Sequence, residues 1–445
     1  MNNNLDWLKK NYPEMDVEKF GEIRQKYLRN ELEVIYDGEI CSLKGTKYMS
    51  SYDELSVIEQ QNGLMPDYFS QRGFNLAENG KLGMIILNGG VATSYEKELG
   101  YRPTKGIFQA IMLTPISFIA IKLYSIYQTG LPIPTYFMNS PSTDKDTKDY
   151  LKKFNDFNLK VKPKHFCQDL GWPRINPKTA ELITRKSGRL SIVTKGHGDV
   201  YQAFEKSGLY DEFINNGGEI LLICNVDNSE AKIDLTIAGY FSWLNETQQV
   251  QIMFESARQS AEDKKGGKCV LMKRPDGQTG PGILELTRIS PHSHNDLLNI
   301  EEFNTNMGWL HTSIDRKMFD LPFRVIKKPR LTNVDDPERG ESQEVVQFEH
   351  EAHKLVELVE LGHSHILFVP RDLRFWPNKY FHDQIKKQKL LVEKYKNLYD
   401  WLFKLNPSAN ECILPVKTEL LNQLGFEKGI VTSQITIRGN HSGSR

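Results

Sequence analysis

The feature that most constrains the fold of this chain is a series of short, uninterrupted apolar runs separated by segments of helical periodicity. Continuous runs of this length are typical of strands that are buried on both faces of a parallel sheet. The alternation of such runs with helices predicts an α/β sheet with helices on both of its faces. The runs expected to form strands are 84–87, 134–138, 190–193 and 219–224, and the segments expected to form helices are 114–127, ending at Gly130, 144–154 and 200–207.

Two flanking regions and one later segment depart from this alternation. Residues 1–75 are polar with helical spacing, and 380–405 predicts a long amphipathic helix or a helix pair. The segment from Gly267 predicts a hairpin, because 269–272 and 283–286 flank a turn at Pro275-Asp276-Gly277. We therefore expect a helical N-terminal segment (1–75), a catalytic domain (76–385) and a C-terminal helical region with its tail (386–445).

The composition excludes several classes of protein. The 445 residues carry a formal net charge of +0, which argues against a nucleic-acid binder that relies on bulk charge. The five cysteines include no CxxC pair, as expected for reduced thiols in the cytoplasm. The N-terminus has no signal-peptide pattern, and the most apolar stretch, 110–121, is too short to span a bilayer. The sequence thus predicts a cytoplasmic protein without a membrane segment.

Polar and glycine-rich blocks follow the predicted strands. Asn88-Gly89-Gly90 follows one apolar run, and Asn225-Val226-Asp227 follows another. In parallel α/β sheets ligands bind beyond the carboxyl ends of the strands, so both blocks are expected at a binding edge. Glycines let a nucleotide approach the backbone, and Asp227 is a carboxylate of the kind that holds Mg²⁺ together with phosphate oxygens. The loop Gly196-His197-Gly198-Asp199 can expose backbone amides to a base or a phosphate.

Each block also has a structural alternative. Asp227 could cap a helix, Asp199 could cap the helix that begins at Val200, and Lys105 could be a solvated surface lysine. The glycine turn fits neither the dinucleotide GxGxxG pattern nor the P-loop pattern, which leaves a nicotinamide dehydrogenase a distant third possibility. Two His-x-His pairs, 292/294 and 363/365, lack further ligands at metal-site spacing and are interpreted as loop or strand-edge histidines.

Taken in order, these blocks resemble the UTP-dependent sugar-1-phosphate uridylyltransferases, most of all those of the UDP-glucose pyrophosphorylase type. The resemblance runs from about Lys81 to Lys379. It covers 87–90 with 93–94, 103–105, 138–140 with 143–147, 166–168, 173–176, 196–199, 207–209, 225–228, 303–306 and 374–379.

The resemblance implies a Rossmann-like nucleotidyltransferase fold of the GT-A-like kind, in which helices flank a mixed sheet. It implies an Mg²⁺-dependent transfer of a uridylyl group from UTP to a hexose 1-phosphate, glucose 1-phosphate first, which yields a UDP-sugar and pyrophosphate. It implies no nucleic-acid or membrane partner. Catalysis would fall to Lys105 at the UTP phosphates, to Lys379 at the sugar phosphate and to Asp227 as the metal ligand.

The remaining roles that the resemblance implies are binding roles. A carboxamide and backbone amides can match the donor–acceptor edge of uracil. The nucleotide would be bound by Leu87, Asn88, Gly89, Gly90, Gln168 and Gly196, and the sugar phosphate by His197, Asn225, Glu285, Asn304 and Asn306.

The chain departs from the family pattern in three places. Ile86 stands where relatives often have lysine, Ala92 stands where they often have glycine, and residues 95–102 form an unusual insertion before Pro103. Lys417 is a second candidate for the late lysine, because it ends a Pro-Val-Lys triplet. Only 66 residues follow Lys379, so no oligomeric state is carried over from the family. Two rival functions stay open: a UDP-N-acetylhexosamine pyrophosphorylase, and a non-catalytic sensor of UTP or UDP-sugars.

Overall fold

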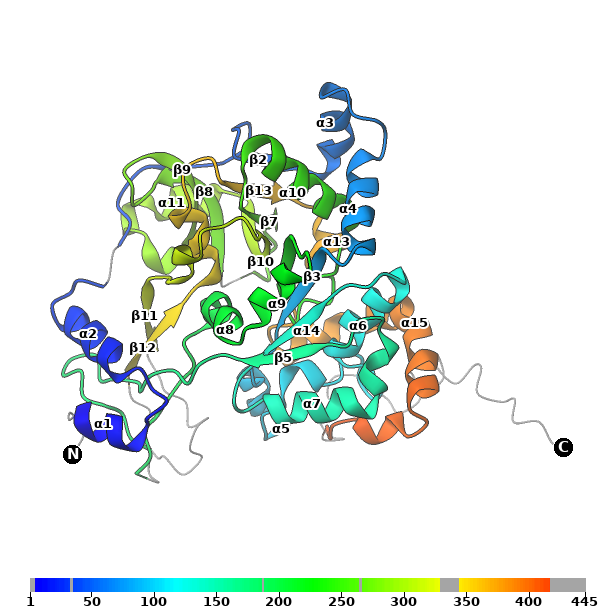
Figure 1. Ribbon diagram of the computed structural model, residues 1–445. Helices are drawn as coiled ribbons and strands as arrows, with labels where there is room; N and C mark the ends of the chain where they lie inside the picture. The colour runs from blue at the N-terminus through cyan, green and yellow to red at the C-terminus, as the bar shows by residue number, and fades with distance from the viewer. Residues whose placement is uncertain (1–4, 33–34, 186–187, 264–265, 329–343, 417–445) are drawn as a thin grey trace.

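The computed structural model describes residues 5–32, 35–185, 188–263, 266–328 and 344–416 (Figure 1). Lys417 and the end of the predicted C-terminal region lie outside these residues. The described chain forms a mixed α/β structure around one large sheet. In spatial order its main strands are β2 (Met49–Ser51), β13 (Ser364–Phe368), β7 (Ile252–Arg258), β10 (Glu302–His311), β6 (Ile220–Asn225), β3 (Leu82–Leu87), β4 (Thr135–Asn139) and β5 (Lys164–Cys167).

Four neighbouring strands of this sheet form the parallel sheet that the apolar runs predict. Strands β6, β3, β4 and β5 are parallel neighbours, and they contain three of the four predicted runs. Strand β10 lies antiparallel between β6 and β7, which makes the whole sheet mixed. The hairpin prediction is also confirmed, since β8 (Gly267–Lys273) pairs antiparallel with β9 (Thr279–Glu285).

The fourth apolar run does not form a sheet strand, so that prediction was wrong. Within the described residues 188–194, Leu190 and Ile192 make only isolated bridges, to Thr184 and Pro173. Their side chains belong to a small apolar cluster with Phe20 of α2 (Val17–Leu28). The run is apolar because it covers this satellite core, which lies away from the central sheet.

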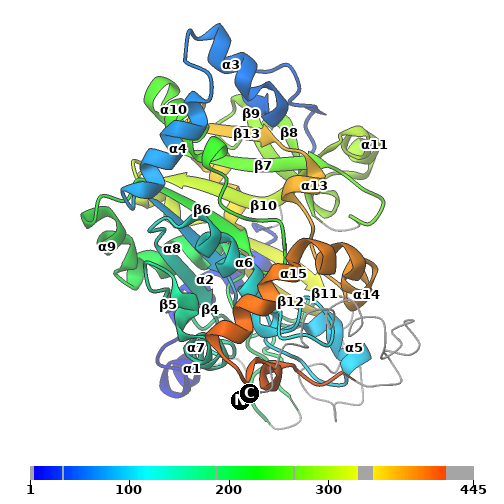
Figure 2. The same ribbon diagram turned by 90° about the vertical axis from the view of Figure 1, so that its right-hand side faces the viewer.

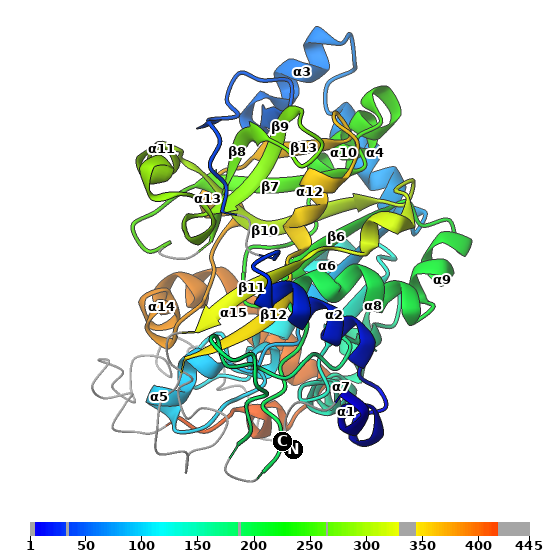
Figure 3. The same ribbon diagram turned by 90° about the vertical axis from the view of Figure 1, so that its left-hand side faces the viewer.

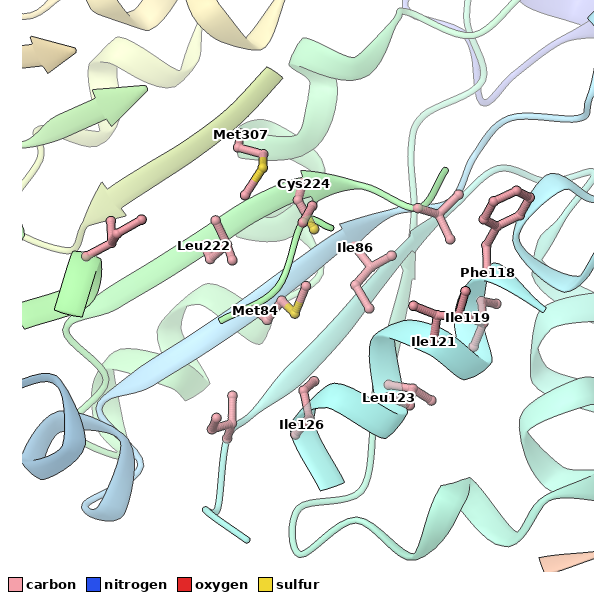
Figure 4. Close-up of a cluster of buried hydrophobic side chains, with 14 of the residues drawn as sticks. Met84, Ile86, Phe118, Ile119, Ile121, Leu123, Ile126, Leu222, Cys224 and Met307 are labelled. Atoms are coloured by element: carbon pink, nitrogen blue, oxygen red, sulfur yellow. The ribbon is translucent and has the colours of Figure 1, made fainter. Parts of the chain in front are cut away.

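Helices cover both faces of the sheet because its side chains alternate between two apolar clusters. Met84 and Ile86 of β3 face one cluster, and Ile85 and Leu87 face the other. Figure 4 shows Met84 and Ile86 pointing toward α6. The first face is covered by α4 (Tyr68–Glu78), α6 (Phe118–Thr129), α7 (Asp144–Lys153), α10 (Leu235–Gln248) and α15 (Gln388–Leu405), and the second by α8 (Val200–Lys206), α9 (Leu209–Asn215) and α12 (Leu355–Leu358) (Figures 2 and 3).

Helix α6 illustrates how local sequence sets an element's bounds. The helix begins four residues later than predicted because Ser117 caps it, accepting the Ala120 N–H at 3.0 Å, and Pro115 precedes the cap. It ends at Gly130, which adopts φ 64°, as the sequence predicts. Trp401 of α15 packs against Tyr124 of α6, with ring centroids 5.0 Å apart.

The N-terminal residues contribute both helices and strands. Helices α1 (Leu5–Asn11) and α2 pack beside a separate hairpin of β11 (Phe323–Lys328) and β12 (Val345–His350) (Figure 3). Strands β1 (Ile40–Cys41) and β2 pair with β8 and β13, so this segment also extends the main sheet. Near the other end, the predicted helix pair is confirmed as α14 (Phe381–Lys386) and α15. Among the described residues, no helix combines the length and the apolar character needed to cross a membrane.

Candidate active site

A cleft of about 1700 Å³ opens at the carboxyl ends of β3, β4 and β6. The topology therefore brings the predicted binding edge together, as expected for parallel strands. Asn88, Asn304 and Asn306 are not among its lining residues. The predicted site residues that line it are Leu87, Gly89, Gly90, Lys105, Gln168, Gly196, His197, Asn225, Asp227, Glu285 and Lys379.

The glycine turn after β3 carries the Gln168 carboxamide on its surface. A Cβ atom at Gly89 would lie only 1.9 Å from Gln168 Nε2, so the turn can approach this side chain only as glycine. Gln168 is 6% exposed, and its Oε1 is buried without a hydrogen-bond partner among the described residues. An unpaired buried acceptor is costly unless a ligand supplies a donor, which fits a role in recognising a base.

Asn88 lies beneath this turn and does not reach the cleft. Its backbone N–H donates to Met138 O at 2.8 Å, and its side-chain Nδ2 donates to Asn139 Oδ1 and Thr147 Oγ1. The residue is fully buried. Asn88 therefore supports the turn from below, and it is Gly89 and Gly90 that border the cleft.

Backbone hydrogen bonds between the segments on either side of the insertion set the position of Lys105. Lys105 N–H donates to Gly90 O at 3.2 Å, and Ala92 N–H donates to Pro103 O at 2.9 Å. Residues between these two segments fold out into α5 (Glu96–Leu99), so the insertion leaves Lys105 beside the glycine turn. Its Nζ lies 2.7 Å from Asp227 Oδ2. The alternative of a solvated surface lysine was wrong, since the Lys105 side chain is only 12% exposed.

Asp227 is joined to the late lysine through the backbone. Asn378 donates to Asp227 O from both its N–H and its side-chain Nδ2, each at 3.1 Å. An antiparallel bridge between Asn228 and Pro377 extends this pairing. Lys379 follows directly and lines the same cleft. Three residues distant in the sequence, Lys105, Asp227 and Lys379, thus come together.

Asp227 does not cap a helix, so that alternative was wrong. The next helix, α10, is capped by Asp234, which accepts the Ile237 N–H at 3.1 Å. Among the described residues, no group of three or more His, Cys, Asp or Glu side chains is arranged to hold a metal ion. A single carboxylate at a cleft suits Mg²⁺, which takes one or two carboxylates and completes its shell with phosphate oxygens and water.

The glycine–histidine loop packs tightly against the segment that follows β12. Gly196 adopts φ 87°, and a Cβ atom there would lie 2.7 Å from His350 O. His197 Nδ1 accepts the Ala352 N–H at 3.3 Å, and burial lowers the pKa of His197. The ring is therefore neutral near pH 7 and carries its proton on Nε2, as a donor. Asp199 does not cap α8 as one alternative held, because its carboxylate accepts the Asp169 N–H instead.

A bulge in β10 lies next to Asn225, which lines the cleft. The pairing of β10 with β7 shifts between Asn304 and Met307, and Asn306 adopts φ 57°. The bulge turns the Asn306 side chain so that its Nδ2 donates to Asn225 Oδ1 at 3.1 Å. Asn304 supports this geometry by accepting the Asn306 N–H at 3.0 Å.

Two charged groups near the site were missed at the sequence level. Arg324 lines the cleft and pairs with Glu285 at 2.8 Å and with buried Glu351. Arg374, in the block that precedes Lys379, forms a buried ion pair with Glu255 at 2.6 Å. A lone glutamate inside the apolar run 252–257 is a signal that could have indicated the second pair.

The His-x-His pairs do not form metal sites among the described residues. His292 pairs with Asp37 at 2.7 Å, and His294 contacts Ile289 O. His365 is buried within β13, where it contacts Ser50 Oγ at 3.1 Å. His365 therefore occupies an interior strand of the sheet, so the expectation of a loop or strand-edge histidine was wrong at this position.

Comparisons with known proteins find relatives over most of the chain. A family model described as UTP–glucose-1-phosphate uridylyltransferase matches residues 17–411. A probable UTP–glucose-1-phosphate uridylyltransferase of Schizosaccharomyces pombe is 26% identical over 338 residues, which are 73% of this chain and 60% of that protein. The Saccharomyces cerevisiae enzyme of that name is 25% identical over 376 residues, 82% of this chain and 71% of that protein. The chain therefore spans about 60–70% of these relatives' length.

Solved structures share the fold. A UDP-glucose phosphorylase of Trypanosoma brucei superposes with a TM-score of 0.63 at 22% identity, over 84% of this chain and 74% of that one. A uridine diphosphate N-acetylglucosamine pyrophosphorylase of the same organism gives 0.65 at 16% identity, over 97% and 90%. The expected mixed-sheet nucleotidyltransferase fold is thereby confirmed.

Proposed function

Because the chain belongs to the UTP–glucose-1-phosphate uridylyltransferase family, we propose that it transfers a uridylyl group from UTP to a hexose 1-phosphate. Glucose 1-phosphate is the first candidate substrate, and the products are a UDP-sugar and pyrophosphate. The observation that carries this proposal is the convergence of Lys105, Asp227 and Lys379 in one cleft with Gln168. Two cations and a carboxylate suit a pair of polyanionic substrates.

The reaction needs positioning more than covalent chemistry. A phosphate oxygen of the sugar 1-phosphate attacks the α-phosphorus of UTP. The opposite bond, from the α-phosphorus to the oxygen that bridges it to the β-phosphorus, breaks, and pyrophosphate leaves. Lys105 would neutralise the UTP phosphates, and Lys379 together with the neutral His197 donor would hold the sugar phosphate. Orientation of this kind can supply about 7–11 kcal/mol of the barrier.

Different residues of the cleft would hold the base and the metal. Gln168 Oε1 would accept a hydrogen bond from uracil, whereas cytosine would leave groups unpaired. Asp227 would hold Mg²⁺ with phosphate oxygens. The metal would supply neutralisation of the charge that develops on pyrophosphate. Lys105 would then have to share the Asp227 carboxylate that it contacts at 2.7 Å.

A second candidate is transfer to N-acetylglucosamine 1-phosphate. A solved uridine diphosphate N-acetylglucosamine pyrophosphorylase covers 97% of this chain with a TM-score of 0.65, which favours keeping this sugar in the assay.

All five cysteines are free, as expected in a reducing compartment, and this supports a cytoplasmic location.

The test is pyrophosphate release from UTP, Mg²⁺ and a panel of sugar 1-phosphates, with ATP and CTP as controls for the base. Asp227→Asn should lower turnover about 10²–10³-fold, by analogy with other single charge-stabilising groups. Asp149→Asn is a matched control, because Asp149 also pairs with a lysine, at 2.6 Å, but on the surface of α7. Binding of UTP without pyrophosphate release from any sugar would replace the enzyme proposal with the sensor.

A further inference from the structure

Ser94, just before the insertion, and Tyr95, its first residue, form hydrogen bonds to the backbone of the segment that carries the late lysine. Ser94 Oγ donates to the backbone carbonyl of Lys379 at 2.6 Å. Tyr95 OH donates to the carbonyl of Asn378 at 3.2 Å. We call Ser94 and Tyr95 the clasp. It joins the glycine-turn segment to a segment 285 residues later in the chain.

The Tyr95 ring contacts the other lysine of the site. Lys105 Nζ lies 5.3 Å from the centroid of the ring, a cation–π distance. The ring is fully buried and packs edge-on against Phe108 and Phe381, with centroids 5.5 and 5.6 Å away. Because the surrounding side chains hold the ring in place, Tyr95 can position the Lys105 ammonium group that contacts it.

The hydroxyl group of Tyr95 remains a donor throughout the physiological pH range. Burial, and after it the charge of Asp227, raise the pKa of Tyr95 well above its ordinary value of 10.0. The bond to Asn378 O therefore does not depend on pH under assay conditions. Asn378 in turn donates twice to Asp227 O. The clasp thus reaches each of the three groups that are to face the triphosphate and the sugar phosphate.

We propose that Ser94 and Tyr95 are positioning residues that fix Lys105 and Lys379 relative to each other before the phosphates bind. This inference rests on the proposed function for the identity of the ligand. Without the clasp, the Lys105–Asp227 ion pair and the Asn378 hydrogen bonds would still relate the two ammonium groups, and the bound substrate would have to complete their ordering. Preorganised charges avoid that cost, so the clasp should affect the phosphate end of the nucleotide and leave the base end unaffected.

The test compares UTP with uridine. Calorimetry with each ligand, and turnover with UTP and sugar 1-phosphate, would be measured for wild type, Ser94→Ala, Tyr95→Phe and Tyr95→Leu. The first two variants each remove one hydrogen bond and should weaken UTP binding or lower kcat about threefold to tenfold. Tyr95→Leu also removes the ring under Lys105 and should cost more. Uridine lacks the phosphates, so its affinity should change by less than about twofold in all three variants. A change of that size is smaller than the loss of one hydrogen bond to the ligand would cause.

Tyr101→Phe provides the matched control. Tyr101 lies in the same insertion and its hydroxyl donates to a backbone carbonyl, that of Pro415, at 2.8 Å. Loss of this hydrogen bond tests whether destabilising the insertion is enough to affect the site. It should change neither UTP affinity nor kcat. A melting temperature for each variant separates misfolding from misplacement, and Tyr95→Phe keeps the buried ring if Tyr95→Leu fails to fold.

A Lys379→Ala background tests whether the clasp acts through the lysine. There Ser94→Ala should have no further effect on turnover, whereas a merely structural role would give additive losses. Equal losses for uridine and UTP, or additive losses in this background, would overturn the proposal. If wild type releases no pyrophosphate with any sugar, the proposed function fails, and the clasp is still decided by the difference between the UTP and uridine affinities.

Discussion

Replacing Gly89 with alanine should displace the Gln168 carboxamide and weaken binding of the base. The added Cβ would lie 1.9 Å from Gln168 Nε2, and ordinary contact begins at about 3.4 Å. The carboxamide must therefore retreat by about 1.5 Å. A shift of this size moves a hydrogen bond out of the 2.7–3.2 Å range in which it is effective.

The expected loss is that of one or two hydrogen bonds to the base. At about 0.5–1.5 kcal/mol for each bond, uridine and UTP should both bind about tenfold more weakly. The fold itself should tolerate the change, since Gly89 does not have a positive φ and the next nearest side chain, Ser140, lies 3.6 Å away. The melting temperature should therefore change little.

A double-mutant cycle with Gln168→Ala decides whether this reasoning holds. Once Gln168 is truncated, the new methyl group meets only the Ser140 contact at 3.6 Å, so Gly89→Ala should add nothing to the loss caused by Gln168→Ala. Calorimetry with uridine on the four proteins measures the coupling. Independent, additive losses would show that the alanine acts directly on the ligand and would refute the argument from the Gln168 clash.

Three further predictions follow from other parts of the structure. Gly90→Ala should leave the melting temperature unchanged but weaken UTP binding in calorimetry, because a Cβ atom there meets no protein atom within 4 Å and lies at the cleft. Arg374→Met should lower the free energy of unfolding in urea by about 3–5 kcal/mol, since Glu255 is left buried without its cation. Arg258→Met, which removes an exposed ion pair, should cost less than about 1 kcal/mol, and similar losses for the two would contradict this. Burial lowers the pKa of His365 to about 4, so the unfolded chain takes up a proton first and stability should fall as the pH drops from about 6.5 toward 4, by up to about 3 kcal/mol. His365→Gln should remove this contribution and make the pH dependence shallower in urea titrations, and an unchanged slope would exclude this residue as a source.

The elements that the sequence predicts well are those in which one local signal dominates. Strands β3 and β6 are apolar at nearly every position and only six residues long, and this short length beside flanking glycines favours a strand over a buried helix. The end of α6 needs only Gly130, and the hairpin of β8 and β9 needs only its Pro-Asp-Gly turn. By contrast, β1 and β2 span only two and three residues and depend on pairing with distant strands, which no local pattern encodes.

In the candidate site, too, local sequence signals predict some residues, and tertiary contacts alone position the others. The glycine turn and Asp227 could be placed because each follows a recognisable strand and parallel strands end at one edge. The approach of Lys379 to Asp227 depends on hydrogen bonds from Asn378 across 151 residues. Likewise, the direction of the Asn306 side chain is set by a bulge whose register only the assembled sheet defines. Contacts of this kind arise from tertiary packing and leave no periodicity in the sequence.

The two sequence departures near the glycine turn prove to be one structural feature. Ala92 is 2% exposed and belongs to the same apolar cluster as Tyr95 of the insertion and Phe381 of α14. Its φ is not positive, so its backbone does not require glycine. The methyl group therefore packs within this cluster, and the residue also lines the cleft. Loss of function alone would not explain why Ala92 packs against the insertion. Their contact favours an altered but intact route to the same arrangement of lysines, and this weighs against the sensor as an account of these departures.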